Sequence, residues 1–164
     1  MIKYKYDQYK KDVDWIGYSV RVYEDEVSTP GLKWSPITIV AIARGGLVPG
    51  VYLSHYLNRS LETIKWQLRD GNDQPSLSDQ FISQTIGKEL LIVDDINDSG
   101  ETFSQLLTCF KNEPYWYSDI EIKKNIKTAC LIEKSSSSFK VDICPNKTDK
   151  EDWIVFPWEN EPHI

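Results

Sequence analysis

Three carboxylates stand close together where an apolar run gives way to small polar residues. The run Leu90-Leu91-Ile92-Val93 is typical of a short strand buried on both faces. Asp94, Asp95 and Asp98 follow it. Open α/β sheets bind ligands at the carboxyl ends of their strands, and carboxylates there commonly share a magnesium ion with an oxygen-rich ligand. Asp94 and Asp95 therefore predict a magnesium-assisted ligand site.

The residues after these acids are suited to hold an anion. Asp98, Ser99, Gly100 and Thr102 are typical of a tight turn that opens a helix, expected here over residues 101–110. A helix N-terminus presents unsatisfied N–H groups and the positive end of a dipole, which favour a bound phosphate. The structural alternative is that two acids merely end a strand and a third caps a helix.

The whole string from Leu90 to Thr102 resembles the phosphoribosyl pyrophosphate (PRPP) binding motif of the type I phosphoribosyltransferases. That motif is an apolar strand, two acids, an apolar residue, any residue, Asp, Ser or Thr, Gly, any residue and Thr, and every position matches. The resemblance implies an α/β fold, with a mainly parallel central sheet flanked by helices. It also implies an enzyme that uses PRPP and Mg²⁺.

A second turn follows an earlier apolar run. Residues 37–43 are typical of another buried strand, and Arg44, Gly45 and Gly46 come directly after it. Two glycines at a strand end let a ligand approach the backbone N–H groups closely, and Arg44 adds a positive charge. Alone, this could be only a tight turn before a helix. The string from Ala43 to Gly50 also resembles the pyrophosphate loop of the 6-oxopurine phosphoribosyltransferases, especially the bacterial xanthine-guanine enzymes.

The resemblance implies a role for each matching residue around PRPP. Asp94 and Asp95 would hold the ribose hydroxyls, directly or through magnesium, and Asp98 would accept a proton from the purine as the glycosidic bond forms. Arg44 and Gly45 would bind pyrophosphate. The residues whose backbone amides or hydroxyls would hold the 5′-phosphate are Ser99, Gly100, Glu101 and Thr102.

The resemblance also assigns a base site to the C-terminal third of the chain. Lys134 matches a lysine that donates to the purine 6-oxygen, and Trp153 matches an aromatic residue that stacks on the base. The backbone of Ile154 would read the substituent at the purine 2-position. Glu159 stands where the bacterial enzymes have Asp, which leaves its role near the metal open. The structural alternatives are core packing for Trp153 and a solvated loop position for Lys134.

Alternating helices and strands are expected to position these residues. The apolar spacing predicts a helix over residues 6–26 and another over 51–57, and further strands are expected over 61–68 and 125–132. Such an order implies right-handed crossovers and a parallel sheet, so Arg44, Asp94 and Lys134 should meet at one edge. The polar segment 69–87 is expected to be a structureless loop. The family resemblance implies that it is an active-site lid, and the alternative is a passive insertion.

Length and composition favour one domain over residues 1–164. The family resemblance implies a core over about 37–145 and a small hood from about 1–30 and 146–164. The net charge of −6 disfavours a protein that binds the nucleic-acid backbone. No apolar run is long enough to span a membrane and no signal-peptide core is visible, so a cytoplasmic protein is expected. The three cysteines, which form no CxxC pair, are expected to be buried thiols.

The sequence thus predicts a magnesium-dependent phosphoribosyltransferase that acts on guanine, xanthine or hypoxanthine in purine salvage. A homodimer or homotetramer is expected, with Tyr115-Trp116-Tyr117 as a candidate interface. Two alternatives stay open. One is transfer to another base, and the other is a non-catalytic regulator that senses PRPP and binds nucleic acid.

Overall fold

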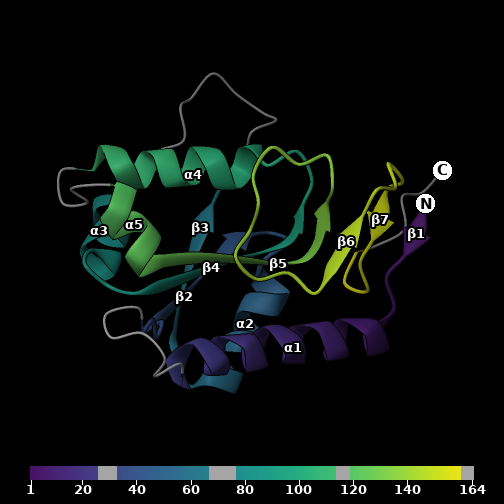
Figure 1. Cartoon of the computed structure of the whole chain (residues 1–164), viewed down its shortest axis with the longest axis horizontal. Coiled ribbons are helices and arrows are strands. Elements are labelled where there is room, and N and C mark those ends of the chain that lie inside the picture. Colours follow the sequence, from purple (N-terminus) through teal and green to yellow (C-terminus); the bar gives the residue numbers. More distant parts are fainter. Residues whose placement is uncertain (26–32, 67–76, 114–118, 160–164) are drawn as a thin grey trace.

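The computed structural model describes residues 1–25, 33–66, 77–113 and 119–159, and its centre is a sheet of five parallel strands (Figure 1). Their order across the sheet is β3-β2-β4-β5-β6. The strands are β2 (Thr38–Ala43), β3 (Ser60–Lys65), β4 (Leu90–Asn97), β5 (Ile126–Lys134) and β6 (Asn146–Thr148). In the register, Ala41 of β2 lies opposite Val93 of β4, and Asp94 lies opposite Cys130 of β5. The predicted mainly parallel α/β sheet is confirmed.

Helices cover both faces of this sheet because its central strands are apolar on both sides. The helices are α1 (Tyr6–Asp25), α2 (Leu47–Leu57), α3 (Asp79–Thr85), α4 (Glu101–Asn112) and α5 (Asp119–Asn125). Alternate residues of each strand enter different cores. Leu91 and Val93 pack with α1 and α2, whereas Leu90 and Ile92 pack with α3, α4 and α5. Figure 1 shows α4 and α1 on opposite sides of the sheet.

A second, two-stranded sheet joins the two ends of the chain. β1 (Ile2–Lys3) pairs in parallel with β7 (Ile154–Val155), and Figure 1 shows these two short strands beside each other. Helix α1, which was expected in the hood, packs in the main core, since Val13, Ile16 and Val20 are fully buried under the main sheet. The hood itself stays a prediction.

A buried carboxylate ties this small sheet to α1 and β6. Asp12 accepts hydrogen bonds from the Tyr4 hydroxyl and from Nδ2 of Asn146, the latter at 2.7 Å. The ring of Tyr4 meets that of Phe156 edge-on at 5.2 Å, and Phe156 stacks on Trp158 at 5.0 Å. The position of the tail therefore depends on contacts with residues far away in sequence.

Several boundaries differ from those that the sequence predicts. The expectation of a structureless loop over 69–87 is wrong for its second half, because α3 begins after Ser78, whose Oγ accepts from the Phe81 N–H at 3.2 Å. α2 begins at Leu47 rather than at residue 51, since Pro49 is tolerated in a first helical turn. α5 and β6 were not expected. Residues 67–76 and the Tyr115-Trp116-Tyr117 segment lie outside the described residues.

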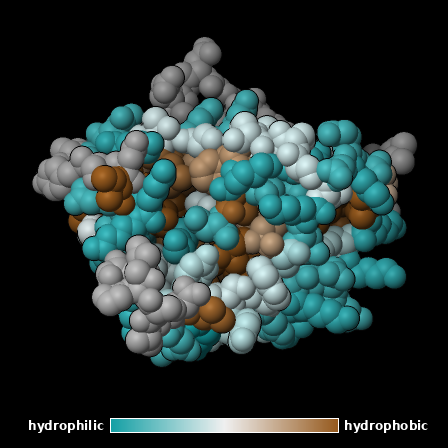
Figure 2. Space-filling view, in the orientation of Figure 1, coloured by the Kyte–Doolittle hydropathy of each residue, from teal (hydrophilic) through white to brown (hydrophobic). Residues whose placement is uncertain are grey.

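The surface in Figure 2 is largely hydrophilic, with hydrophobic residues visible in the middle of this face, between α1 and α4. Within the four described ranges, no helix combines the length and apolar character needed to cross a membrane. All three cysteines are free thiols. Cys130 is buried as expected, whereas Cys109 and Cys144 are half-buried.

Candidate active site

One cavity of about 880 Å³ lies at the carboxyl ends of β2, β4 and β5, roofed by the tail after β6. It brings together every residue that the sequence assigned to the site. These residues are Arg44, Gly45, Asp94, Asp95, Asp98, Ser99, Gly100, Glu101, Thr102, Lys134, Trp153, Ile154 and Glu159. The parallel topology explains this meeting, because all three strands end at the same edge. Their individual roles remain predictions.

Sequence reasoning missed other lining residues, among them Trp66, Asn97 and Asp152. Trp66 comes one residue after β3 ends, so the same rule about strand ends could have found it. Its side chain is buried, and its indole N–H has no hydrogen-bond partner among the described residues. Asp152 belongs to the tail, whose position no local pattern predicts.

The acid pair lies inside β4 rather than after it, since the strand continues to Asn97. The Asp95 N–H donates to Oδ1 of Asp94 at 2.9 Å. Burial, and then the negative charge of Asp95, raise the pKa of Asp94 well above its usual range. Burial also raises the pKa of Asp95, to about 6, and the charge of Glu159 acts in the same direction. Two adjacent carboxylates that are costly to ionise form a site that favours a cation.

Gly45 packs directly on this acid pair. A Cβ atom at Gly45 would lie 2.3 Å from both carboxylate oxygens of Asp95, which is far inside contact distance. The backbone of the 44–46 turn can therefore approach the acids only with glycine at this position. The peptide bond between Ala43 and Arg44 is cis, and the Arg44 side chain is exposed at the cavity wall.

The 98–102 turn presents the start of α4 to the cavity, and the N-cap residue makes no side-chain cap hydrogen bond. Gly100 is the N-cap of α4 and has φ +90°, a left-handed conformation that glycine adopts without strain. It has no side chain to occupy the first N–H groups of the helix. The Glu101 N–H donates to Ser99 Oγ at 3.3 Å, so this hydroxyl lies beside the first N–H groups of the helix. An anion would meet N–H groups and the positive helix end here.

Lys134 is the last residue of β5 and lies against Asp98. Its Nζ is 2.8 Å from Oδ1 of Asp98 and 3.9 Å from Oε2 of Glu151. The hydrogen bond to Asp98 raises the pKa of Lys134. Only 8% of Lys134 is exposed, so the alternative of a solvated loop lysine is wrong.

Trp153 projects from the tail next to the cavity. Its exposed fraction is 58%, so simple core packing does not account for it. Ile154 and Phe156 behind it are buried and pack in the core with Tyr4. The tail therefore offers a flat, accessible ring at the cavity while its neighbours anchor the backbone.

The acid pair fits the protein share of a magnesium site. Magnesium is usually held by one or two carboxylates together with ligand phosphates and waters. Over the described parts of the chain, no three His, Cys, Asp or Glu side chains gather closely enough to hold a metal on protein ligands alone. Oε2 of Glu159 accepts from the Phe156 N–H at 2.9 Å, so part of this carboxylate is already committed to the tail.

Comparisons with known proteins agree with this fold and this cavity. Residues 16–162 match the family model described as the phosphoribosyl transferase domain. The xanthine-guanine phosphoribosyltransferase of Cereibacter sphaeroides is 30% identical over 126 residues, which cover 74% of this chain and 68% of that protein.

Solved structures of phosphoribosyltransferases also superimpose on this chain. A purine phosphoribosyltransferase from Pyrococcus horikoshii superimposes with a TM-score of 0.72 at 28% identity, covering 99% of this chain and 96% of that one. The Helicobacter pylori xanthine-guanine-hypoxanthine phosphoribosyltransferase gives 0.65 at 25% identity, covering 96% and 92%. A parallel sheet that gathers the PRPP motif, the Arg44 turn and Lys134 at one edge, together with these matches, shows that the chain belongs to the type I phosphoribosyltransferase family.

Proposed function

We propose that this protein transfers the phosphoribosyl group of PRPP to a 6-oxopurine base, giving a nucleoside monophosphate and pyrophosphate. The observation that carries the proposal is the contact between Lys134 and Asp98 inside a cavity that also holds the PRPP motif. One side chain can donate to a purine 6-oxygen and the other can accept a proton from N7. The printed names of the relatives, which are purine and xanthine-guanine enzymes, support the same substrate class.

The chemistry calls for positioning and charge more than for covalent catalysis. Displacement of pyrophosphate from C1 of the ribose passes through an oxocarbenium-like transition state, with negative charge growing on the leaving group. The 98–102 turn holds the 5′-phosphate, Asp94 and Asp95 hold the ribose, and Arg44 receives the pyrophosphate. Magnesium bound through Asp94 and Asp95 would add positive charge beside the same oxygens.

Asp98 is the general base in this proposal. Its carboxylate is 54% exposed toward the cavity and is held by Lys134 from one side. As the glycosidic bond forms, the purine becomes more acidic and Asp98 accepts its proton. Trp153 stacks on the ring, the Ile154 backbone contacts its 2-position substituent, and Glu159 is a candidate further magnesium ligand beside the acid pair.

The test is base-dependent release of pyrophosphate from PRPP, measured with and without Mg²⁺ and with a panel of bases. Turnover with guanine, xanthine or hypoxanthine that stops when Mg²⁺ is chelated supports the proposal. Turnover with another base alone would correct the substrate class. PRPP binding without any turnover, combined with nucleic-acid binding at moderate salt, would favour a regulator instead.

A cytoplasmic location and a homodimer or homotetramer also belong to this proposal. Exposed aromatic side chains on α1 support the assembly, since Trp15 and Tyr18 are 47% and 63% exposed. Sedimentation velocity measures the assembly directly.

A further inference from the structure

The serine-rich segment after β5, residues 135–139, packs against the 98–102 turn. Both the backbone N–H and the Oγ hydroxyl of Ser138 donate to the carbonyl oxygen of Ser99, at 3.0 and 2.8 Å. A Cβ atom at Gly100 would lie 2.5 Å from the Phe139 nitrogen, so the two segments touch. The serine run is therefore a structural partner of the turn rather than a separate surface loop.

The far end of this segment is also fixed. The Phe139 ring stacks on Phe103 of α4, with centroids 5.6 Å apart and planes 15° apart. The Phe139 carbonyl accepts from Asn97 Nδ2 at 2.7 Å and from Ser137 Oγ at 2.8 Å. Asn97 is the last residue of β4, so the segment is tied to the strand that leads into the turn.

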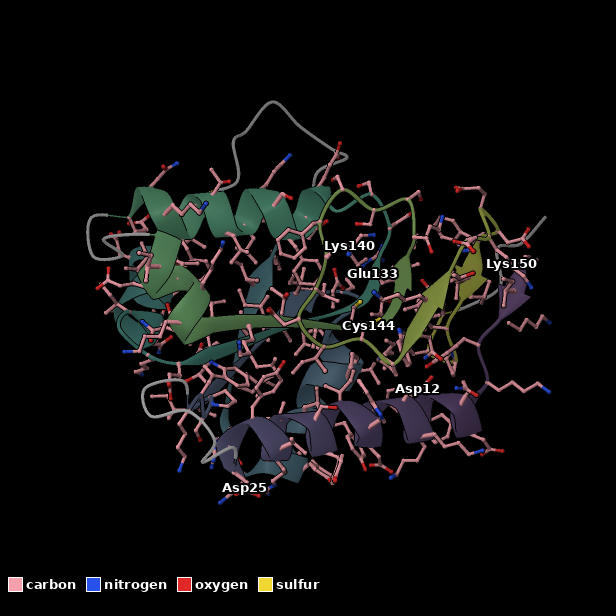
Figure 3. All side chains as sticks on the ribbon, in the orientation of Figure 1. Asp12, Asp25, Glu133, Lys140, Cys144 and Lys150 are labelled. Atoms are coloured by element: carbon pink, nitrogen blue, oxygen red, sulfur yellow. The ribbon has the colours of Figure 1, made fainter. Side chains whose placement is uncertain are left out.

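The Glu133 side chain binds both Asn97, which holds the Phe139 carbonyl, and Val141, which follows the segment. Its side chain is 1% exposed, and its Oε2 accepts from Asn97 Nδ2 at 3.2 Å and from the Val141 N–H at 2.9 Å. Lys147 and Lys140 place their ammonium groups 3.4 and 4.0 Å from Oε1. Figure 3 shows Glu133 and Lys140 near each other at the end of β5. A buried carboxylate paired with two lysines thus fixes the end of β4 at Asn97 and the chain at Val141, just after the segment.

We infer that Ser138 is a positioning residue that orients the Ser99–Gly100 peptide for anion binding. In a trans peptide the C=O and N–H bonds point in opposite directions. Because Ser138, which does not line the cavity, holds the Ser99 carbonyl, the Gly100 N–H points the other way, toward the cavity that Ser99 and Gly100 line. Gly100, in its left-handed conformation, has no Cβ to prevent this peptide from flipping. A flipped peptide would turn a carbonyl toward the phosphate.

This inference rests on the proposed function, in which the turn binds the 5′-phosphate of PRPP and of the nucleotide product. The Ser138 hydroxyl supplies one of the two hydrogen bonds on the Ser99 oxygen. Its loss should therefore weaken the preference for this orientation of the Ser99–Gly100 peptide without unfolding the turn. A single hydrogen bond at an exposed site contributes about 0.5–1.5 kcal/mol, which corresponds to roughly 3- to 10-fold in affinity.

The experiment compares Ser138→Ala with Ser136→Ala, an identical substitution two residues away in the same run. Ser136 is exposed, and its side chain makes no hydrogen bond to any described residue. Calorimetry measures binding of guanosine 5′-monophosphate, guanosine and pyrophosphate to the full-length protein. We expect Ser138→Ala to weaken the binding of guanosine 5′-monophosphate roughly 3- to 10-fold, while guanosine and pyrophosphate bind as tightly as they do to the wild type. The KM for PRPP should rise by a similar factor with little change in kcat, and Ser138→Thr should restore both.

Three results would overturn the inference: unchanged monophosphate affinity in Ser138→Ala, equal losses for monophosphate and guanosine, or the same loss in Ser136→Ala. Failure of the proposed function has a different signature, because the wild-type protein itself would then bind neither PRPP nor the monophosphate. That outcome would also remove the basis of the inference.

Discussion

The Nζ atom of Lys134 lies 2.8 Å from Oδ1 of Asp98, so the proposed donor to the base and the proposed proton acceptor are in direct contact. They come from the ends of two neighbouring parallel strands, β5 and β4. A purine that uses both groups must take over part of this contact with its 6-oxygen and N7. The pair therefore orients both side chains before the base arrives.

Replacing Asp98 by Asn tests the proton-acceptor role. The amide oxygen can still accept a hydrogen bond from Lys134, but the group no longer accepts a proton. We expect kcat to fall roughly 10²-fold or more, the usual scale for losing a general base, while calorimetric PRPP affinity stays close to that of the wild type. Turnover near the wild-type rate would remove Asp98 from this role.

Base choice should depend on Lys134. An adenine 6-amino group would face the ammonium with no acceptor between them, at a cost of about 1–3 kcal/mol. Lys134→Met should therefore raise KM for the 6-oxopurine and reduce its roughly 10- to 100-fold advantage over adenine. The measurement is kcat/KM for guanine, hypoxanthine and adenine.

Trp153→Ala provides the matched comparison for base binding. Stacking on an aromatic ring contributes about 1–3 kcal/mol and does not distinguish one flat base from another. The kcat/KM values for guanine, hypoxanthine and adenine should therefore all fall by a similar factor. If adenine is the best substrate of the wild-type enzyme, the match at Lys134 is coincidental, although PRPP binding would still stand.

The buried acid pair predicts a pH-dependent stability in the metal-free protein. The folded-state pKa of Asp95 is about 6, above the ordinary value of 3.8, so the folded state binds more protons than the unfolded state between these pH values. The free energy of unfolding should therefore fall as pH rises from about 4 to about 6. Urea denaturation in chelator buffer measures it.

Asp95→Asn removes this contribution together with the negative charge that raises the pKa of Asp94. The variant should be more stable than the wild type at pH 7, and its advantage should shrink toward pH 4. Asp149→Asn, at an exposed position away from the cavity, serves as the control. If the extra stability of Asp95→Asn does not change with pH, the raised pKa of Asp95 is not the cause of the pH dependence.

Gly45→Ala should damage the site because its new methyl group would lie 2.3 Å from the Asp95 carboxylate oxygens. Either the acid or the 44–46 turn must move, and we expect kcat/KM for PRPP to fall at least 10²-fold. Gly87→Ala is the control. Gly87 has φ +66° with open space around it, so the variant should lose about 1 kcal/mol of stability through backbone strain but keep its activity.

Asp12 should contribute strongly to stability although it lies outside the cavity lining. Asp12 is 6% exposed, and its carboxylate accepts from Tyr4, Gln8 and Asn146. Asp12→Ala removes this shared acceptor, including that of the Tyr4 hydroxyl, and should cost about 2–4 kcal/mol in the free energy of unfolding. Asp25→Ala, on the exposed end of the same helix in Figure 3, should change stability by less than about 0.5 kcal/mol.

The sequence by itself determined the parts of this protein that are local. The apolar run before Asp94, the small residues of the 98–102 turn and the spacing on α1 each act over a few residues, so their strands and helices could be predicted. The meeting of Arg44, Asp94 and Lys134 also followed from the sequence, because parallel strands end at a common edge.

Only the tertiary structure decided the contacts between distant segments. β1 pairs with β7 across the length of the chain, and Ser138 reaches Ser99 over 39 residues. Two-residue strands and a run of serines have no periodicity, so their conformations depend on the partners that they meet. The burial of Lys134 and the raised pKa of Asp95 have the same origin, since desolvation depends on what the fold packs around a side chain.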